Sequence, residues 1–427
     1  MILRSFVAGV LTDDRVPPRP DALQMLAALS PGDAGIQARL ARAEFESPER
    51  NLPAAQDHAR RACDLSPWNF QYRSLLASIE DAAGHQQQAE EAITAAVRLA
   101  PNNSEVQWKM ANILLRGGKL QQAAPHFQAA CSSNDELLGL VIDTLWQASG
   151  GDAKLLAASI PTGAGSQLTL ANYLLGKSQV TQAVQIFERL PNRDKLAAPM
   201  LSGFIGGVAG LGQPALARRL WAEVAGLDPN NLPDISNGGF ESPIRTTFPE
   251  FDWRISSNKY ADVSVDTRTA RTGSRSLRVT FKGIDTTSLN REITQLIVVQ
   301  AGLAYRLRCY VKAEGVESPE GPRLVITDPT TGAALASSNP IKPGTYGWTP
   351  LDLDFIAPSG AASGSVTKAQ DDGSGPDAQL TQNSIAVLLS LKRTPRFSYD
   401  DPTKGTIWLD DFELQKAEAG GVGKLER

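Results

Sequence analysis

The first half of the chain carries a pattern of small and large apolar residues that repeats at one fixed interval. Ala55, Ala89 and Ala123 are evenly spaced along the chain. Three further sets keep the same interval: Ala62–Ala96–Ala130, Gly84–Gly118 and Pro67–Pro101. Small residues at fixed places let two antiparallel helices approach closely, while glycine ends the first helix of a pair and proline stops the second. The pattern predicts stacked antiparallel helix pairs over residues 21–230.

This repeat interval is about 34 residues, which is the length of the tetratricopeptide repeat, and the residues resemble that family. The two clearest repeats carry its packing residues at Leu76–Ala77, Gly84, Ala89, Ile93, Ala96 and Pro101, and at Met110–Ala111, Gly118, Ala123, Phe127 and Ala130. Weaker units follow, and residues 136–161 are helical but depart from the pattern. The resemblance implies a helical solenoid of roughly five pairs with degenerate ends.

Such a solenoid has a groove lined by the first helix of each pair, and it usually holds a peptide or partner protein. In the two clearest repeats the groove-facing candidates are Gln71, Ser74, Ser78, Glu105, Trp108 and Asn112. The alternative is that these side chains are solvated surface or packing between repeats. The full Lys, Asn and Arg set that grips a C-terminal carboxylate in some members is not evident.

From about residue 231 the pattern changes to period-two alternation broken by turn residues. This alternation predicts short strands with no helices between them, which is typical of an antiparallel β-sandwich. The predicted strands include residues 261–266, 276–283, 305–313, 322–328, 349–358, 384–392 and 405–415. We therefore expect an α-helical solenoid over residues 21–230 and a β-sandwich over 231–416, flanked by an N-terminal segment (1–20) and a flexible tail (417–427).

The order of short motifs in the second half resembles the galactose-binding-like jelly roll of carbohydrate-binding modules, in particular families four and nine. The motifs are NGGFE (Asn237–Glu241), TGSRSLRV (Thr272–Val279), VVQAGLAYRLRCYVKA (Val298–Ala313), GWTPLDLDFIAP (Gly347–Pro358) and IWLDDFEL (Ile407–Leu414). The resemblance implies a structural calcium ion held by Glu241 and Asp410, with Asp411 as the alternate and carbonyls near Gly273. Alternatively, these carboxylates pair with Lys or Arg or face water.

Sugar binding needs flat aromatic faces with polar groups beside them. Trp253, Tyr260 and Tyr399 lie in irregular segments and are the candidate platforms, with Arg254 and Asn258 as polar contacts. For each aromatic residue the alternative is packing in the core or a loop. Tyr305 and Tyr310 lie in one long predicted strand and face opposite ways, so one of them should enter the core.

Composition and charge exclude several classes of protein. Apolar residues make up 42% and charged residues 21%, which is typical of a soluble globular protein. The net charge of −4 leaves no basic half to neutralise phosphates, so we expect no nucleic-acid partner. No stretch is long enough for a membrane helix, and the chain as given shows no export signal. Cys63, Cys131 and Cys309 are widely spaced, which predicts three buried thiols.

The sequence carries no catalytic signature such as GxSxG, a P-loop or a histidine beside a nucleophile. We expect a non-enzymatic adaptor that binds a protein through the solenoid and a carbohydrate through the jelly roll. Association of these two folds points to bacterial envelope polysaccharide biosynthesis or export, in the envelope or periplasm. One alternative is a protein–protein assembly factor whose sandwich binds no sugar. A second is a carbohydrate-active enzyme with two carboxylates in one cleft.

Overall fold

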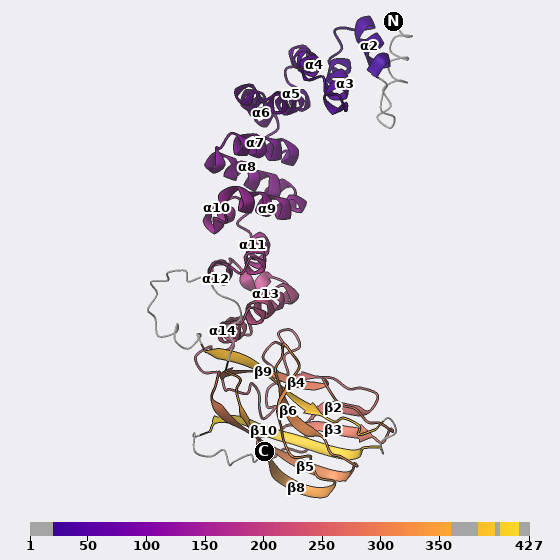
Figure 1. Ribbon diagram of the computed structural model, residues 1–427, viewed down its shortest axis with the longest axis vertical. Coiled ribbons are helices and arrows are strands. Elements are labelled where there is room, and N and C mark those ends of the chain that lie inside the picture. The colour runs from indigo at the N-terminus through magenta and orange to yellow at the C-terminus, as the bar shows by residue number, and fades with distance from the viewer. Residues whose placement is uncertain (1–19, 360–382, 398–401, 418–427) are drawn as a thin grey trace. The chain divides into compact units, whose positions relative to one another are not determined.

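The computed structural model describes residues 20–359, 383–397 and 402–417. Helices fill the first part and antiparallel strands the second, which confirms the predicted fold class (Figure 1). Most of the predicted N-terminal segment and tail lie outside the described residues. The chain divides into two compact units, Met1–Pro191 and Asn192–Arg427, which we call the repeat unit and the mixed unit.

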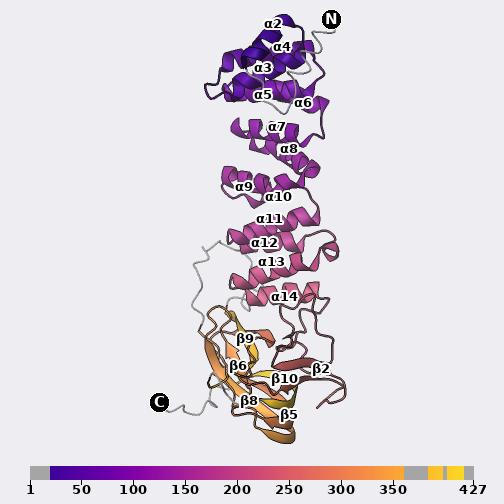
Figure 2. The ribbon, with the colours of Figure 1, turned by 90° about the vertical axis from the view of Figure 1, so that its right-hand side faces the viewer.

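The repeat unit consists of short helices in which each packs against the next along the chain (Figures 1 and 2). The described helices are α2 (Pro20–Leu29), α3 (Ala34–Glu46), α4 (Leu52–Leu65), α5 (Phe70–Ala82), α6 (Gln86–Leu99), α7 (Ser104–Arg116), α8 (Leu120–Ser133), the 3₁₀ turn η1 (Asp135–Leu137), α9 (Leu138–Ser149), α10 (Ala153–Ala158), α11 (Ala164–Gly176) and α12 (Val180–Glu188). None of the helices in the described part of the chain has the length and hydropathy needed to cross a membrane.

The repeat interval of the sequence is visible in the geometry of α4–α8. All six alanines of the two alanine series are 0% exposed, because they form the contact between the helices of each pair and its neighbour. Gly84 and Gly118 end α5 and α7 with φ of +79° and +71°, in the left-handed region that favours glycine. Asn69 and Asn103 cap the start of the same two helices through their side-chain oxygens. These features confirm the tetratricopeptide-like helix pairs.

The predicted off-pattern region, residues 136–161, forms a shortened pair. Its first helix, α9, has 12 residues, but its second helix, α10, has only six. Because the second helix is shorter, α11 begins earlier in the sequence than the repeat interval predicts. For this reason the sequence period breaks here while the helical packing continues.

Buried polar groups join neighbouring pairs. The Glu80 carboxylate on α5 is buried and accepts hydrogen bonds from Gln56 Nε2 (2.8 Å) and Arg60 Nη2 (2.7 Å) on α4, and it pairs with His85 (2.8 Å). Burial raises the pKa of Glu80, but the hydrogen bonds to His85, Arg60 and Gln56 outweigh it, so the pKa lies below its usual value. Glu80 therefore stays ionised and ties α4 to α5.

The mixed unit contains a helix pair and two five-stranded sheets. Its elements are η2 (Arg193–Lys195), α13 (Ala198–Gly210), α14 (Pro214–Val224), β1 (Arg254–Ile255), β2 (Ala261–Asp266), β3 (Ser276–Lys282), β4 (Ile293–Gln300), β5 (Ala304–Glu317), β6 (Arg323–Thr327), β7 (Ala334–Ser337), β8 (Gly344–Ile356), β9 (Ser384–Lys392) and β10 (Lys404–Lys416). The strand orders are β1-β4-β9-β6-β7 and β2-β3-β10-β5-β8, and every recorded pair is antiparallel. One continuous apolar core lies between the sheets.

Strand alternation explains the core. Tyr305 is 3% exposed and stacks on Phe355 with ring centroids 5.6 Å apart, whereas Tyr310 on the same strand is half-buried on the other face. The prediction that one of the two tyrosines enters the core is confirmed. Cys63, Cys131 and Cys309 are buried free thiols, also as predicted.

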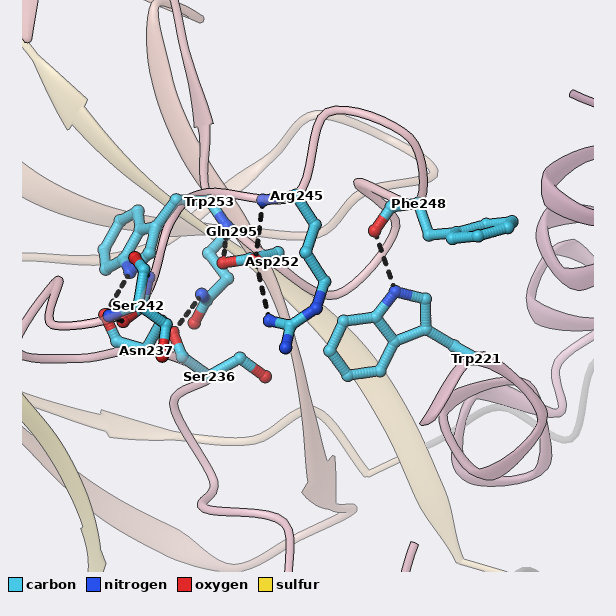
Figure 3. A network of polar contacts seen from close by, with 9 residues as sticks. All are labelled: Trp221, Ser236, Asn237, Ser242, Arg245, Phe248, Asp252, Trp253 and Gln295. Carbon is cyan, nitrogen blue, oxygen red and sulfur yellow. Dashed lines mark hydrogen bonds and ion pairs between the residues drawn. The ribbon is translucent and has the colours of Figure 1, made fainter. Parts of the chain in front are cut away.

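The last helix of the mixed unit packs against its strands. Trp221 on α14 is 0% exposed, contacts the Phe251 ring edge-on at 5.7 Å and donates a hydrogen bond from Nε1 to the Phe248 carbonyl (2.9 Å; Figure 3). Arg218 on the same helix donates to the Pro233 carbonyl. The predicted boundary at residue 231 lies between the end of α14 (Val224) and the start of β1 (Arg254), whereas the compact units divide after Pro191, before α13.

Candidate functional site

The six predicted groove residues lie on α5 and α7, the first helices of two successive pairs. They form three sets whose members are separated by the repeat interval: Gln71 and Glu105, Ser74 and Trp108, Ser78 and Asn112. Spacings of three and four residues place each helix's members on one face. We call the face marked by these residues, and its continuation on α9, the first-helix surface.

On α5 these side chains differ in exposure. Gln71 is exposed, whereas Ser74 is buried and accepts a hydrogen bond from Lys109 Nζ (3.2 Å) on α7. Ser78 is half-buried and donates to the Ser74 carbonyl (3.0 Å). Ser74 therefore contributes to packing between the helices, and Gln71 has the greater access to a ligand.

On α7 Glu105 is exposed, and Trp108 and Asn112 are half-buried. Glu105 pairs with Lys109 (2.9 Å), and the amide of Asn112 donates to the Trp108 carbonyl (2.8 Å). The Trp108 ring meets Phe127 of α8 edge-on at 5.5 Å. Lys109 thus links Glu105 to Ser74. Lys109 is not among the predicted groove residues, although its spacing of four residues after Glu105 is the signal for a helical ion pair.

The first-helix surface continues onto α9. Trp146 follows Asn112 by the same repeat interval and is half-buried. Its ring meets Tyr173 of α11 edge-on at 5.8 Å, and Lys177 Nζ lies 5.8 Å from the Trp146 ring centre and 5.1 Å from that of Tyr173. We call Asp143, Trp146, Tyr173 and Lys177 the aromatic cluster. Extending the repeat interval by one step would have found Trp146.

Hydrogen bonds fix the acidic side of the aromatic cluster. Tyr173 Oη donates to Asp143 Oδ1 (2.9 Å), and Gln147 Nε2 donates to Asp143 Oδ2 (2.9 Å). Burial, together with the Asp143 carboxylate, raises the pKa of Tyr173 to about 12. The hydroxyl therefore remains a donor at neutral pH, and both Asp143 oxygens are engaged.

In the sandwich, the predicted sugar platform Trp253 is a core residue. It is 1% exposed, packs against Phe240 (5.1 Å) and Phe412 (4.8 Å), and donates from Nε1 to the Asn237 carbonyl. The adjacent Asp252 accepts bonds from the backbone and guanidinium of Arg245 (Figure 3). Because both neighbouring rings cover the indole, Trp253 cannot stack on a ligand, and this part of the sugar-site prediction is wrong.

Each of the other described residues of the predicted sugar site has different contacts. Arg254 is exposed and donates to the Pro249 carbonyl, while Asn258 is half-buried and bonds to the Ser288 carbonyl and Glu292. Tyr260 is half-buried with Lys259 over its ring (4.7 Å). Tyr399 lies outside the described residues. The hydrogen bonds of Asn258 thus hold its own loop together. The contributions of Arg254 and Tyr260 to sugar binding stay predictions.

Cationic side chains also lie over two rings of the sheet β2-β3-β10-β5-β8. The guanidinium of Arg271 lies 3.4 Å from the centre of the Tyr310 ring, and Lys312 Nζ lies 5.2 Å from that of Trp408. Trp408 is itself buried and donates from Nε1 to Asp266 (2.7 Å). A sugar stacking on either ring would compete with these cations.

The residues predicted to hold calcium lie close together. A Cβ placed on Gly239 would lie 3.7 Å from Asp410 Oδ1 and 3.8 Å from Glu241 Cγ. All four carboxylate oxygens already accept hydrogen bonds: those of Glu241 from Ser274 and Arg275, and those of Asp410 from the backbone of Arg271 and Asp411. Nowhere in the described parts of the chain do three or more His, Cys, Asp or Glu side chains gather to hold a metal.

This donor set fits a hydrogen-bonded tie between the start and end of the sandwich rather than a calcium ion. Hydrogen bonds from the Ser274 backbone lower the pKa of Glu241, whereas burial raises that of Asp410. Glycine is favoured at Gly273, because its φ is +61° and a Cβ would lie 2.4 Å from the Glu241 carboxyl carbon, so that the Glu241 side chain would have to move. Calcium binding stays a prediction that this geometry does not favour.

Comparison with known proteins gives structural likeness only. No known family profile matches the chain, and no curated protein matches it. A crystal structure of MamA protein is 11% identical, covers 40% of this chain and 94% of its own, and has a TM-score of 0.33. YrrB, described as a TPR protein with an unusual peptide-binding site, is 13% identical over 50% of this chain and 95% of its own, with a TM-score of 0.27. TTC0263 of Thermus thermophilus, described as a thermophilic TPR protein, is 20% identical over 33% and 74%, also at 0.27.

Proposed function

We propose that this chain is a non-enzymatic scaffold whose repeat unit binds an extended segment of a partner protein along the first-helix surface. The observation that carries the proposal is the series Ser78, Asn112 and Trp146, which recurs at the repeat interval on three successive first helices. Stacked helix pairs of this kind form extended binding surfaces, because each repeat presents the same positions to one side.

The chemistry of the surface suits an extended peptide. Gln71 and Glu105 are exposed, and Asn112 and Trp146 are half-buried, so amide, carboxylate and aromatic groups alternate along it. An extended segment exposes backbone N–H and C=O groups that amides can pair, and side chains that rings can contact. Removing an amide from the centre of this surface should therefore weaken binding.

The test is selection from a random peptide library by the full-length chain, followed by fluorescence anisotropy with the selected peptides. Asn112→Leu removes the amide from the middle of the surface without adding charge and should weaken binding by roughly tenfold. Trp68→Ala is the matched control, because Trp68 is 83% exposed at the turn before α5 and outside the repeating series. If the wild-type chain selects no peptide, or if Asn112→Leu binds as tightly as the wild type does, the proposal fails.

Carbohydrate binding by the sandwich is a weaker proposal that rests on the motif resemblance. Its support is the half-buried position of Tyr260 and Tyr310, and the cations over both rings count against it. A role in envelope polysaccharide biosynthesis or export depends on that binding. A glycan array probed with the full-length chain, with Tyr260→Ala as the comparison, tests the binding on which that role depends.

A further inference from the structure

The aromatic cluster contains Lys177, which differs from Lys109 and Lys119 in the groups that surround its ammonium. Lys109 pairs with Glu105, and Lys119 pairs with Glu90 (2.6 Å). Lys177, at the end of α11, is exposed and faces only the rings of Trp146 and Tyr173, and within the described residues it forms no ion pair. Its ammonium donors are therefore open to a ligand.

The surroundings of Lys177 are fixed in advance. A Cβ on Gly151 would lie 3.1 Å from the Trp146 ring, so the Gly151 backbone covers that ring edge, and Tyr173 meets the ring from α11. Tyr173 and Gln147 hold both oxygens of Asp143. Preorganised groups lose little conformational entropy on binding. The cluster thus combines rigid ring surface with one ammonium that lacks a carboxylate partner.

We propose that the aromatic cluster is the subsite of the first-helix surface that selects an acidic side chain in the bound segment. The carboxylate would accept from Lys177 Nζ, and an apolar neighbour in the segment would contact the rings of Trp146 and Tyr173. Charge complementarity identifies the occupant as an acidic peptide, because a carboxylate is the anionic group that unmodified side chains supply, and its charge-assisted hydrogen bond to an ammonium is roughly twice as strong as a neutral one. This inference rests on the proposed peptide binding and names what the peptide carries.

The experiment uses the full-length chain, the peptides selected from the random library and, for each acidic peptide, its amide isostere with Asn for Asp or Gln for Glu. Lys177→Gln should lower the affinity for the acidic peptide roughly tenfold and leave the affinity for the amide peptide nearly unchanged. Lys177→Arg should keep the preference for acid. Lys119→Gln is the control, because that lysine already has a carboxylate partner.

The outcomes separate the two proposals. Enrichment of acidic residues at one position, lost in Lys177→Gln but kept in Lys119→Gln and Lys177→Arg, supports the subsite. Peptides selected without acidic enrichment, or an acid-to-amide affinity ratio that Lys177→Gln does not change, overturn it while leaving peptide binding intact. A wild-type chain that selects no peptide overturns both. Unchanged thermal unfolding of Lys177→Gln shows that any loss is not a folding defect.

Discussion

The repeat unit and the mixed unit bury apolar surface with different kinds of side chain. In the repeat unit, the contact clusters of α3–α7 are dominated by alanines such as Ala55, Ala59 and Ala62, which permit close approach of neighbouring helices. In the mixed unit, one core joins large residues from both sheets, with Phe240, Trp253 and Phe412 in mutual ring contact. The repeat unit therefore has local contacts that repeat, whereas the mixed unit depends on contacts that occur once.

Sequence separation shows the same difference. Lys109 and Ser74 are 35 residues apart, whereas Arg271 and Asp410 are 139 residues apart. Stability in stacked repeats is close to a sum over neighbours, while a sandwich with one core unfolds cooperatively. A destabilising substitution should consequently affect only neighbouring helices in the repeat unit, but it should lower the stability of the whole sandwich in the mixed unit.

The largest effect is expected for Trp253→Ala. Removing a fully buried indole leaves a cavity between Phe240 and Phe412, and the loss should be about 3–5 kcal/mol of the free energy of unfolding. Denaturant unfolding of the full chain, followed by β-sheet circular dichroism, should show the strands melting early while the helical signal of the repeat unit persists. Trp68→Ala, an exposed tryptophan, should change neither transition. Early loss of both signals would contradict the comparison.

A smaller and local effect is expected for Ala89→Leu. Ala89 is 0% exposed between helices, so a larger side chain forces them apart at a cost of about 1–3 kcal/mol. Hydrogen exchange should speed up in α5–α8 and remain unchanged in the strands. Gln87→Leu on the exposed face of α6 is the control. Faster exchange throughout the chain would show that the repeat unit is more cooperative than its contacts indicate.

Trp221→Phe sharpens the position of the boundary between the two units. The change removes the hydrogen bond to the Phe248 carbonyl and should cost about 1 kcal/mol. If α14 unfolds with the strands, the transition of the mixed unit shifts and that of the repeat unit does not. A shift in the helical transition alone would place α13 and α14 with the repeats.

The smallest effect concerns pH and the repeat unit. Burial lowers the pKa of His126, whose Nδ1 contacts Gln107 Oε1 (2.7 Å). A lowered histidine pKa means that the unfolded state binds the proton more readily, so the contribution is present above the unfolded pKa of about 6.5 and is lost as the pH falls from there toward the folded value. Thermal unfolding between pH 7.5 and 5.5 should show a smaller decline for His126→Phe than for the wild type. An equal decline in thermal stability for the variant and the wild type would mean that other groups, such as His58, cause the pH dependence.

Repeated features were readable from the sequence, and single ones were not. The helices α5–α8 follow from alanines and glycines at a fixed interval, and β2 and β9 match their predicted ranges, Ala261–Asp266 and Ser384–Lys392. The strand β4 (Ile293–Gln300) is absent from the predicted strands, because its first three residues are all buried and break the alternation.

The site shows the same limit. Trp253 lies in an irregular segment, which favoured exposure, but contacts with Phe240 and with Phe412, far along the chain, place it in the core. Lys177 and Trp146 meet because α11 packs against α9, the first helix of the preceding pair. Neither juxtaposition follows from local spacing, since each depends on the tertiary path of the chain.

The position of β10 has a consequence for synthesis on the ribosome. This strand, Lys404–Lys416, lies between β3 and β5 in the middle of its sheet. Translation proceeds from the N-terminus, and domains form as their residues emerge. The helix pairs can assemble while the chain is still being made, but β3 and β5 must wait for β10 with their facing edges unpaired. Nascent chains are therefore most exposed to aggregation or chaperone capture in the interval between the emergence of β5 and that of β10.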